Sequence, residues 1–96
     1  MIKAVRLTKT VRKALRRSPA HVVMKLLGWV DLVENEGLEN ARKIPGFHDE
    51  PLRGQRQGQR SIRLSRAWRA IYVIVDPNGE DKESFAEVTE VSKHDY

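Results

Sequence analysis

Six arginines fall within a stretch of the chain, residues 51–75, that contains no aspartate or glutamate, although the whole chain has thirteen acidic residues. They are Arg53, Arg56, Arg60, Arg63, Arg66 and Arg69. A guanidinium group is a planar fork of donors that fits two phosphate oxygens, and alternate side chains of a strand share one face. Adjacent strands can therefore form an ordered phosphate clamp. Arg63 and Arg69 are the first candidates for it, and we expect the other four to contact an RNA backbone.

A solvated basic face that contacts acidic loops of the same domain is the alternative for this cluster. It fits Arg53, Arg56 and Arg66 better when each is taken singly. Two aromatic residues nearby, Trp68 and Tyr72, fall on one side of a predicted strand. Single-stranded RNA binders stack bases on such rings, but we favour a core role because both sides of this strand carry bulky residues.

The chain ends on Lys93-His94-Asp95-Tyr96, where an ammonium, an imidazole, a carboxylate and a phenol are consecutive. RNA cleavage requires the 2′-hydroxyl to lose a proton, the 5′-oxygen to gain one, and a phosphorane-like transition state to be stabilised. Histidine can perform either proton transfer near neutral pH, and arginines can hold the charge. We therefore expect proton transfer at this terminus and an RNA contact at Lys93, although such a sequence taken alone is usually a frayed end.

His48 is a second acid/base candidate and Glu50 a third, although each is more often a surface loop residue. Three histidines without i, i+4 pairing, in a chain with no cysteine, make a metal site improbable, and His21 is expected to be a packing or surface residue. The sequence contains no Gly-rich phosphate loop, nucleophile elbow or dinucleotide fingerprint. We therefore expect neither a metal nor a cofactor.

The length of 96 residues fits a single domain spanning residues 1–96, and 40% hydrophobic with 32% charged residues is an ordinary globular composition. A net charge of +5 favours polyanions or an acidic protein partner. The amino terminus lacks an apolar stretch of signal-peptide length, and no run of residues is long and apolar enough to span a membrane. These features, with the absence of cysteine, are compatible with a cytoplasmic protein.

The first half of the chain predicts a short edge strand followed by a helical hairpin. The strand covers residues 2–7, and Thr8 or Thr10 caps a helix that ends near residue 17. Ser18-Pro19 then has the pattern of an N-cap followed by proline at the first helical position. The second helix continues to about residue 35, with Gly37 as its stop. Its expected apolar stripe is Val22, Val23, Leu26, Leu27, Val30 and Val33.

Prolines and glycines between residues 38 and 58 predict a long, partly irregular crossing rather than a third regular helix. Strands are expected at residues 60–64, 68–75 and 84–91, with a tight turn at residues 65–67 and another at residues 76–79. The element order β-α-α-β-β-β predicts an α+β fold with a small, mainly antiparallel sheet. Both helices would cover one face and leave the other free for function.

Four segments together resemble the RelE/HigB superfamily of bacterial type II toxins. They are Glu50-Pro-Leu-Arg-Gly, Gly58-Gln-Arg-Ser-Ile-Arg-Leu, Trp68-Arg-Ala-Ile-Tyr and Lys93-His-Asp-Tyr. Members are typically small basic ribonucleases that enter the ribosomal A site, cut mRNA there without a metal, and are neutralised by an antitoxin encoded nearby. The resemblance spans most of residues 44–96. It implies a RelE-like fold, and as partners an antitoxin, mRNA and the 16S rRNA region of the A site.

The resemblance also assigns roles to residues of this chain. The family's Pro-Leu-Lys-Gly turn corresponds to Pro51-Leu-Arg-Gly54, and its basic strand residue and following arginine correspond to Arg63 and Arg69. Its carboxy-terminal histidine, acid and tyrosine correspond to His94, Asp95 and Tyr96, which implies that these residues are catalytic. Two positions depart from the pattern. Some members have lysine where Ser61 stands, and some have histidine where Glu50 stands, a difference for which His48 could compensate.

The leading hypothesis is a ribosome-dependent mRNA endoribonuclease in which Arg63 and Arg69 hold the scissile phosphate. His94 would transfer protons, and Tyr96 would orient the 2′-hydroxyl or stack. One alternative is a gyrase-poisoning toxin similar to the ParE branch, which shares the fold but lacks a nuclease site. Another is a non-catalytic RNA-binding module, for which the basic charge alone would suffice.

Overall fold

A computed structural model of the chain describes residues 1–79 and 83–93. Its helices are α1 (Lys9–Leu15), α2 (Ala20–Glu36) and α3 (Leu38–Arg42), and its strands are β1 (Val5–Leu7), β2 (Glu50–Pro51), β3 (Gln59–Arg63), β4 (Trp68–Val75) and β5 (Phe85–Lys93). Two single-turn 3-10 helices, Pro45–Phe47 and Gly54–Arg56, flank β2. The strands form one five-stranded sheet in the order β1-β5-β4-β3-β2, with only β1 and β5 parallel.

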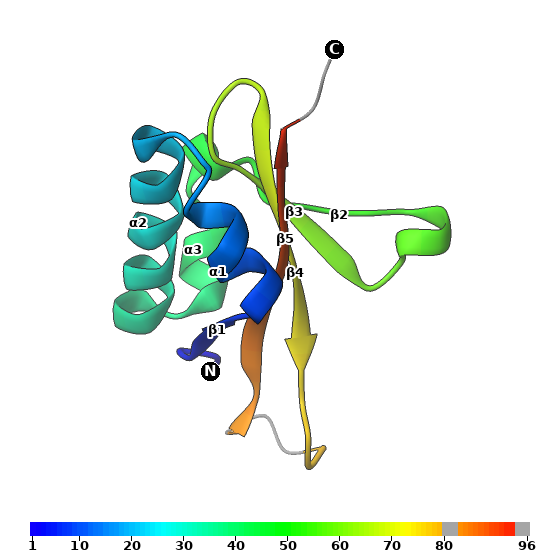
Figure 1. Cartoon of the computed structure of the whole chain (residues 1–96). Coiled ribbons are helices and arrows are strands. Elements are labelled where there is room, and N and C mark those ends of the chain that lie inside the picture. Colours follow the sequence, from blue (N-terminus) through cyan, green and yellow to red (C-terminus); the bar gives the residue numbers. More distant parts are fainter. Residues whose placement is uncertain (80–82, 94–96) are drawn as a thin grey trace.

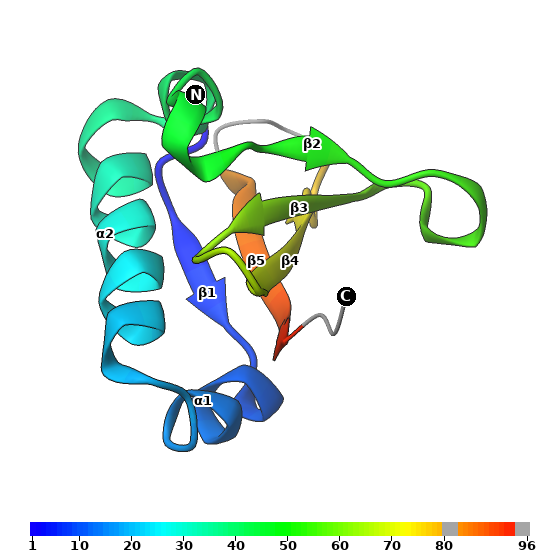
Figure 2. The same ribbon diagram turned by 90° about the horizontal axis from the view of Figure 1, so that it is seen from above.

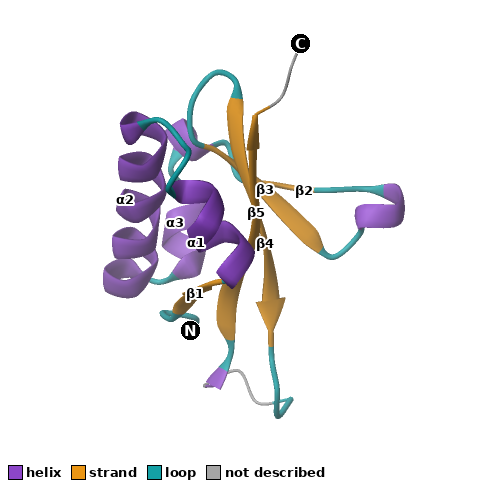
Figure 3. Ribbon diagram, viewed as in Figure 1, coloured by secondary structure: helices purple, strands orange, loops and turns teal. Residues whose placement is uncertain are grey.

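The helices α1, α2 and α3 lie on one face of the sheet, and from the other face projects the loop with the 3-10 turn Gly54–Arg56 (Figure 1; Figure 3). Figure 2 shows the same division from above, with α2 on one side and the β2–β3 excursion pointing away from it. The predicted α+β fold with a mainly antiparallel sheet and an uncovered face is therefore confirmed. The first strand is an edge strand, as expected. In the described residues, no helix is long and apolar enough to cross a membrane.

The helix starts follow local hydrogen bonding. The Thr8 hydroxyl accepts from the Val11 backbone N–H at 3.2 Å and caps α1, as predicted. The predicted Ser18 N-cap is wrong, because the Ser18 hydroxyl donates to the Ala14 carbonyl at 2.8 Å and so belongs to the end of α1. Pro19 takes the N-cap position of α2 instead. Its missing N–H costs nothing there, since the first turn has no acceptor for it.

Gly37 ends α2 as predicted, and it also begins α3, which the sequence did not predict. Its φ of 87° lies in the left-handed region that glycine adopts without strain. The expectation of no third helix is wrong because Leu38 and Ala41 are buried and fix one short helical turn against the core. A five-residue helix is too short to produce a periodic apolar pattern.

The core lies between α2 and the sheet. Trp29, Leu26 and Val33 of α2 are fully buried, and the Trp29 ring centroid lies 5.0 Å from that of Tyr72. Tyr72 therefore has the predicted core role, and Trp68 packs partly buried against the same cluster. One member of the expected apolar stripe is wrong, because Leu27 is 47% exposed. The stripe is rotated toward Trp29, whose large ring fills the space over β4.

Candidate functional site

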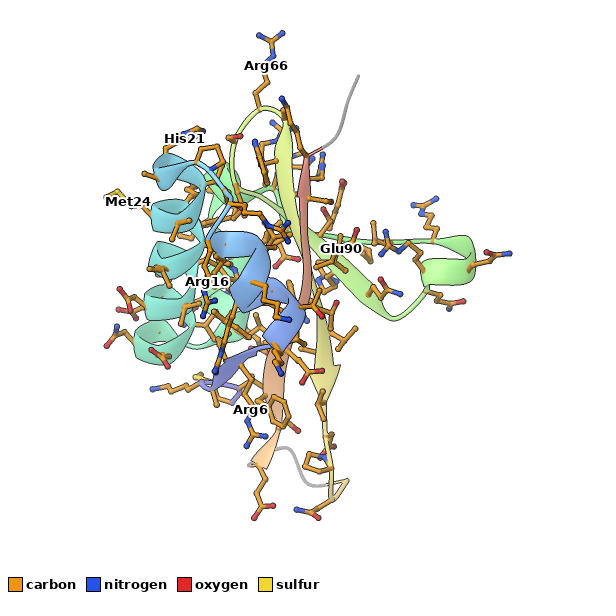
Figure 4. The ribbon with its side chains drawn as sticks, viewed as in Figure 1. Arg6, Arg16, His21, Met24, Arg66 and Glu90 are labelled. Atoms are coloured by element: carbon orange, nitrogen blue, oxygen red, sulfur yellow. The ribbon has the colours of Figure 1, made fainter. Side chains whose placement is uncertain are left out.

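The uncovered face of the sheet collects side chains from four strands. In the β3–β4 ladder Arg63 is opposite Arg69 and Ser61 is opposite Ile71, so these four share a face. Glu50 of β2 is opposite Ser61 and joins them. On β5, Glu90 and Ser92 are opposite Ile71 and Arg69, and Figure 4 shows Glu90 on the side away from the helices.

Arg69 is held in place on this face. Its Nη1 donates to the Ser61 hydroxyl at 3.0 Å and lies 3.6 Å from Oε1 of Glu50. The Arg69 side chain is only 16% exposed and Ser61 is buried, so the guanidinium has little freedom to move. Its cross-strand neighbour Arg63 is exposed. The two arginines of the predicted clamp are therefore adjacent, one fixed and one free to reach toward a ligand.

Glu50 connects this pair to His48. Oε2 of Glu50 lies 3.6 Å from Nε2 of His48, while its other oxygen faces Arg69. Both side chains are about half exposed, at 54% for His48 and 48% for Glu50. His48 itself has a φ of 46°, an uncommon left-handed conformation for a residue other than glycine. The fold thus lines up an imidazole, a carboxylate, a guanidinium and a hydroxyl in sequence along one surface.

A shallow groove of about 200 Å³ runs along this line. It is lined by Glu50, Leu52, Arg56, Ser61, Arg69 and Ile71. Arg56 reaches it from the projecting 3-10 turn, where its guanidinium pairs with Glu90 and donates from Nε to Gln59 at 3.1 Å. The pair with Glu90 joins the projecting loop to β5 and so holds Arg56 at the groove.

Arg60 lies on the opposite, helix-facing side of the sheet, where it is the register partner of Tyr72. Its Nε donates to Oδ1 of Asp49 at 2.7 Å, and the Tyr72 hydroxyl donates to Oδ2 at 2.6 Å. The Asp49 side chain is fully buried, and Arg42 lies 3.4 Å from the Tyr72 hydroxyl oxygen. Burial, followed by the hydrogen bond to Asp49, raises the pKa of Tyr72 to about 12.

This buried network separates Arg60 from the other five arginines of residues 51–75. Its donor already has a carboxylate partner, and its side chain points to the face that the helices cover. The contact with an acidic loop of the same domain, the alternative for the cluster as a whole, is what the structure shows for Arg60. The expected RNA contact at this residue gains no support from its position.

The remaining predicted residues do not join Arg69 on this face by strand register. Arg53 is exposed just before the projecting 3-10 turn, and Arg66 is exposed at the β3–β4 turn, where Figure 4 shows it pointing away from the body of the molecule. Lys93 is the last residue of β5 and is opposite Trp68. His94, Asp95 and Tyr96 lie outside the described residues. They follow in sequence on the strand that carries Ser92 opposite Arg69.

The sequence missed Asp49 and Glu90 as partners of the arginines. Both lie outside the acid-free stretch, and only the fold brings them to Arg60 and Arg56. A signal for Asp49 was present, since His48, Asp49 and Glu50 are consecutive and alternate residues of an extended segment point to opposite faces. Recognising β2 as a strand would have placed Asp49 inside and Glu50 outside. β2 is only two residues long and contains a proline, which an edge strand tolerates.

Metal-binding side chains do not cluster in the part of the chain that the structure describes: no three of its His, Asp and Glu side chains gather where they could hold an ion.

Comparison with known proteins identifies the fold. No protein-family model and no curated protein matches the sequence. Among solved structures, the archaeal RelE-RelB complex from Pyrococcus horikoshii aligns with a TM-score of 0.68 and 24% identity, over 97% of this chain and 96% of that chain. The toxin-antitoxin complex RelBE2 from Mycobacterium tuberculosis aligns with a TM-score of 0.67 and 21% identity, over 98% and 100%.

A third structure, the YoeB/ParE toxin from Agrobacterium tumefaciens, has a TM-score of 0.60 and 23% identity, over 96% of this chain and 99% of that chain. All three match from end to end at low identity, so their common feature with this chain is the arrangement of the backbone. The fold expected from the resemblance to RelE is confirmed. This chain has the fold of the RelE and YoeB toxins.

Proposed function

We propose that this chain is the toxin of a type II toxin-antitoxin system and that it cuts mRNA on the ribosome as a metal-independent endoribonuclease. The observation that carries the proposal is the fixed Arg69 guanidinium on the uncovered sheet face. Ser61 and Glu50 hold it in place, and exposed Arg63 is its cross-strand neighbour. Two adjacent guanidinium groups on an open face fit a phosphodiester better than they fit a buried structural role.

Arg69 and Arg63 hold the scissile phosphate in this proposal and stabilise the charge that builds up on its oxygens. Stabilisation of this kind costs no reorganisation when the donor is already fixed, and the bond from Arg69 to Ser61 fixes it. Glu50 pairs with Arg69 in the free protein, so the arriving phosphate takes over part of that pairing and the Glu50 carboxylate becomes able to accept a proton. Its distance from Arg69 supports this exchange.

Proton transfer needs two groups, one for the 2′-hydroxyl and one for the 5′-oxygen. His94 is the leading candidate for one of them, with Asp95 beside it and Tyr96 orienting the 2′-hydroxyl or stacking. Glu50 or His48 is the candidate for the other, because the described residues place both next to Arg69. Arg53, Arg56, Arg66 and Lys93 contact the RNA backbone around this site.

The partners follow from this activity. A cognate antitoxin encoded nearby would neutralise the protein. Two solved structures that share this fold, from Mycobacterium tuberculosis and Pyrococcus horikoshii, are a toxin-antitoxin complex and a RelE-RelB complex, and this supports the expectation. The net charge of +5 suits a site lined by mRNA and 16S rRNA. Because ribosomes are in the cytoplasm, the proposed activity implies that the protein acts there.

A gyrase-poisoning toxin is the second candidate, because one solved structure with this fold is described as a YoeB/ParE toxin. The fixed guanidinium of Arg69, with Glu50 and His48 beside it, favours the nuclease. DNA damage together with intact mRNA after expression would favour the gyrase poison.

Primer extension on mRNA, shortly after expression of the parent and of His94→Gln, tests the proposal. Discrete cuts with the parent and none with the folded variant are expected. Growth arrest with intact message would refute the nuclease. Intact message without arrest would leave only a binding module. Equal cutting by both proteins would remove His94 from the mechanism and leave the nuclease standing.

A further inference from the structure

A second groove lies where the β3–β4 turn meets α2. It has a volume of about 320 Å³, larger than the groove beside Arg69. Its lining residues are Lys25, Gly46, Arg63, Leu64, Ser65 and Arg66. Three of the six are cations and none is acidic. The cations come from different elements: Lys25 from α2, Arg63 from the end of β3, and Arg66 from the turn.

Lys25 is held toward this groove. Its Nζ lies 4.6 Å from the centroid of the Phe47 ring, a cation–π contact that restrains an otherwise flexible side chain. The backbone at Gly46 lies beside the same ammonium, because a Cβ atom at position 46 would be in ordinary van der Waals contact with Nζ, at 3.7 Å. The side chain is half-buried, and its charge sits at one side of the groove.

Lys25, Arg63 and Arg66 differ from the paired arginines described above in having no carboxylate partner in the part of the chain that the structure describes. Arg56, Arg60 and Arg69 each have a carboxylate within 4.0 Å. Across residues 1–79 and 83–93, no ion pair is formed by Lys25, Arg63 or Arg66. Like charges gathered around one hollow repel one another, and a bound anion relieves that repulsion. The groove therefore offers an anionic ligand three charges that no carboxylate of the described residues pairs with.

We propose that this groove binds the phosphate backbone of the RNA strand as it continues past the cleavage position, with Lys25 as a contact that the sequence did not indicate. The inference rests on the proposed function, because Arg63 connects the two grooves. It lines this one, and it is the register partner of Arg69 in the other. An RNA strand with one phosphate bound to Arg69 and Arg63 would then pass Arg66 and Lys25, so its backbone would stay next to positive charge. This continuity favours RNA over an acidic protein segment.

Fluorescence anisotropy with a labelled single-stranded RNA, 2′-O-methylated so that it cannot be cut, tests the groove without catalysis. Lys25→Gln and Arg66→Gln should each weaken binding roughly threefold to tenfold and reduce the slope of log K against log salt by about 0.7, the value for one lost contact on a single strand. Arg17→Gln removes the same charge from a separate basic surface at the end of α1 and in the turn that follows it, and is the matched control. It should change neither quantity beyond the general effect of charge.

Lys25→Arg should bind RNA as the parent does, because it keeps the positive charge. If Lys25→Gln weakened binding only by disturbing the packing against Phe47, keeping the charge would not be enough to restore it. Arg66 is exposed in the turn, so its variant tests the groove even if Lys25→Gln is unstable. Binding by Lys25→Gln and Arg66→Gln equal to that of Arg17→Gln would overturn the proposal, including the case in which an acidic protein occupies the groove. Failure of the nuclease assay with retained Lys25 and Arg66 effects would refute the proposed activity and leave the RNA groove in place.

Discussion

At the scale of single residues, the paired arginines of residues 51–75 differ in whether their carboxylate partner is buried or exposed. Glu50, Asp49 and Glu90 come from outside the acid-free stretch and pair with Arg69, Arg60 and Arg56. Pairing has a different effect in each place. The partner of Arg60 is the fully buried Asp49, whereas the partner of Arg69 is the half-exposed Glu50, which in the proposed function a phosphate can partly replace. The burial of the carboxylate partner thus separates Arg60 from Arg69, the arginine that we propose to bind phosphate.

Arg69→Lys should keep the positive charge but lose the planar fork and the bond from Nη1 to Ser61. We expect mRNA cleavage to fall by about tenfold to a hundredfold, less than the roughly hundredfold to thousandfold cost of losing a fixed donor completely, because lysine keeps the charge. Rates of primer-extension cuts on programmed ribosomes measure the effect. Arg17→Lys, a change at an exposed residue in the turn after α1, is the matched control. A cleavage rate for Arg69→Lys equal to that of the control would exclude a bidentate phosphate contact.

Tyr72 should ionise at about pH 12, above its ordinary value, because burial and then the hydrogen bond to Asp49 favour the neutral phenol. The folded state therefore holds this proton more tightly than the unfolded state. Its contribution to stability is complete below about pH 10 and is lost as the pH rises toward 12. Ultraviolet absorbance of the phenolate follows the titration, and Tyr72→Phe identifies its signal.

Asp49→Asn should lower the pKa of Tyr72 only in part, because burial is the larger cause and remains. A return of the Tyr72 titration to the ordinary value in this variant, with the fold intact, would show that Asp49 rather than burial is responsible.

At the scale of elements, short connections determine which side chains reach the uncovered face. β2 is an edge strand of the sheet, and the extended chain there points Asp49 toward the helix-covered face and Glu50 toward the uncovered face. Gly37 joins α2 to α3. The amino terminus packs closely against this junction, where the Leu38 N–H donates to the Ile2 carbonyl at 2.8 Å. Both junctions are built from one or two residues. Their local conformation is therefore more important than helical or strand propensity.

Two glycine-to-alanine changes should have opposite effects on stability. Gly37 has a φ of 87°, and a Cβ there would lie 2.6 Å from Sδ of Met1, so Gly37→Ala should lower the free energy of unfolding by about 1–2 kcal/mol. Gly28 lies inside α2 with open space around it, so Gly28→Ala should raise that free energy by about 0.5–1 kcal/mol. Urea unfolding measures both. A stabilising Gly37→Ala would contradict the assigned left-handed junction.

At the scale of the whole molecule, the helices provide the core on one face and leave the other as a broad, shallow surface. The groove beside Arg69 is open and small, at about 200 Å³, so it surrounds little of an RNA chain. A site with few walls gains little positioning of its substrate from the protein alone. In the proposed function the ribosome supplies the positioning, and the basic surface supplies the attraction.

Cleavage should therefore depend on the ribosome. Purified protein should cut an mRNA in the A site of programmed ribosomes at least about a hundredfold faster than the same RNA free in solution, because the ribosome fixes the orientation of the scissile phosphate. Single-turnover rates on the two substrates measure the ratio, and His94→Gln gives the background. Equal rates would mean that the protein positions RNA unaided and would argue against ribosome dependence.

Periodicity and turn chemistry in the sequence determined the large elements. The α2 stop at Gly37, the cap at Thr8 and the full extent of β4 follow from local backbone preferences, which the sequence records directly. The mainly antiparallel sheet with helices on one face follows from the order of these elements. The adjacency of Arg63 and Arg69 could be predicted as well, because cross-strand neighbours follow from the tight turn between them.

Only the tertiary structure decided which of the arginines are compensated and what lies beside Arg69. Ion pairs between residues distant in sequence, such as Arg60 with Asp49 and Arg56 with Glu90, depend on how the two-residue β2 and the projecting loop pack against the sheet. The same holds for Lys25, which reaches the β3–β4 turn only because α2 lies against it. Local patterns carry no information about such contacts, since the energy of a charge depends on its neighbours in space.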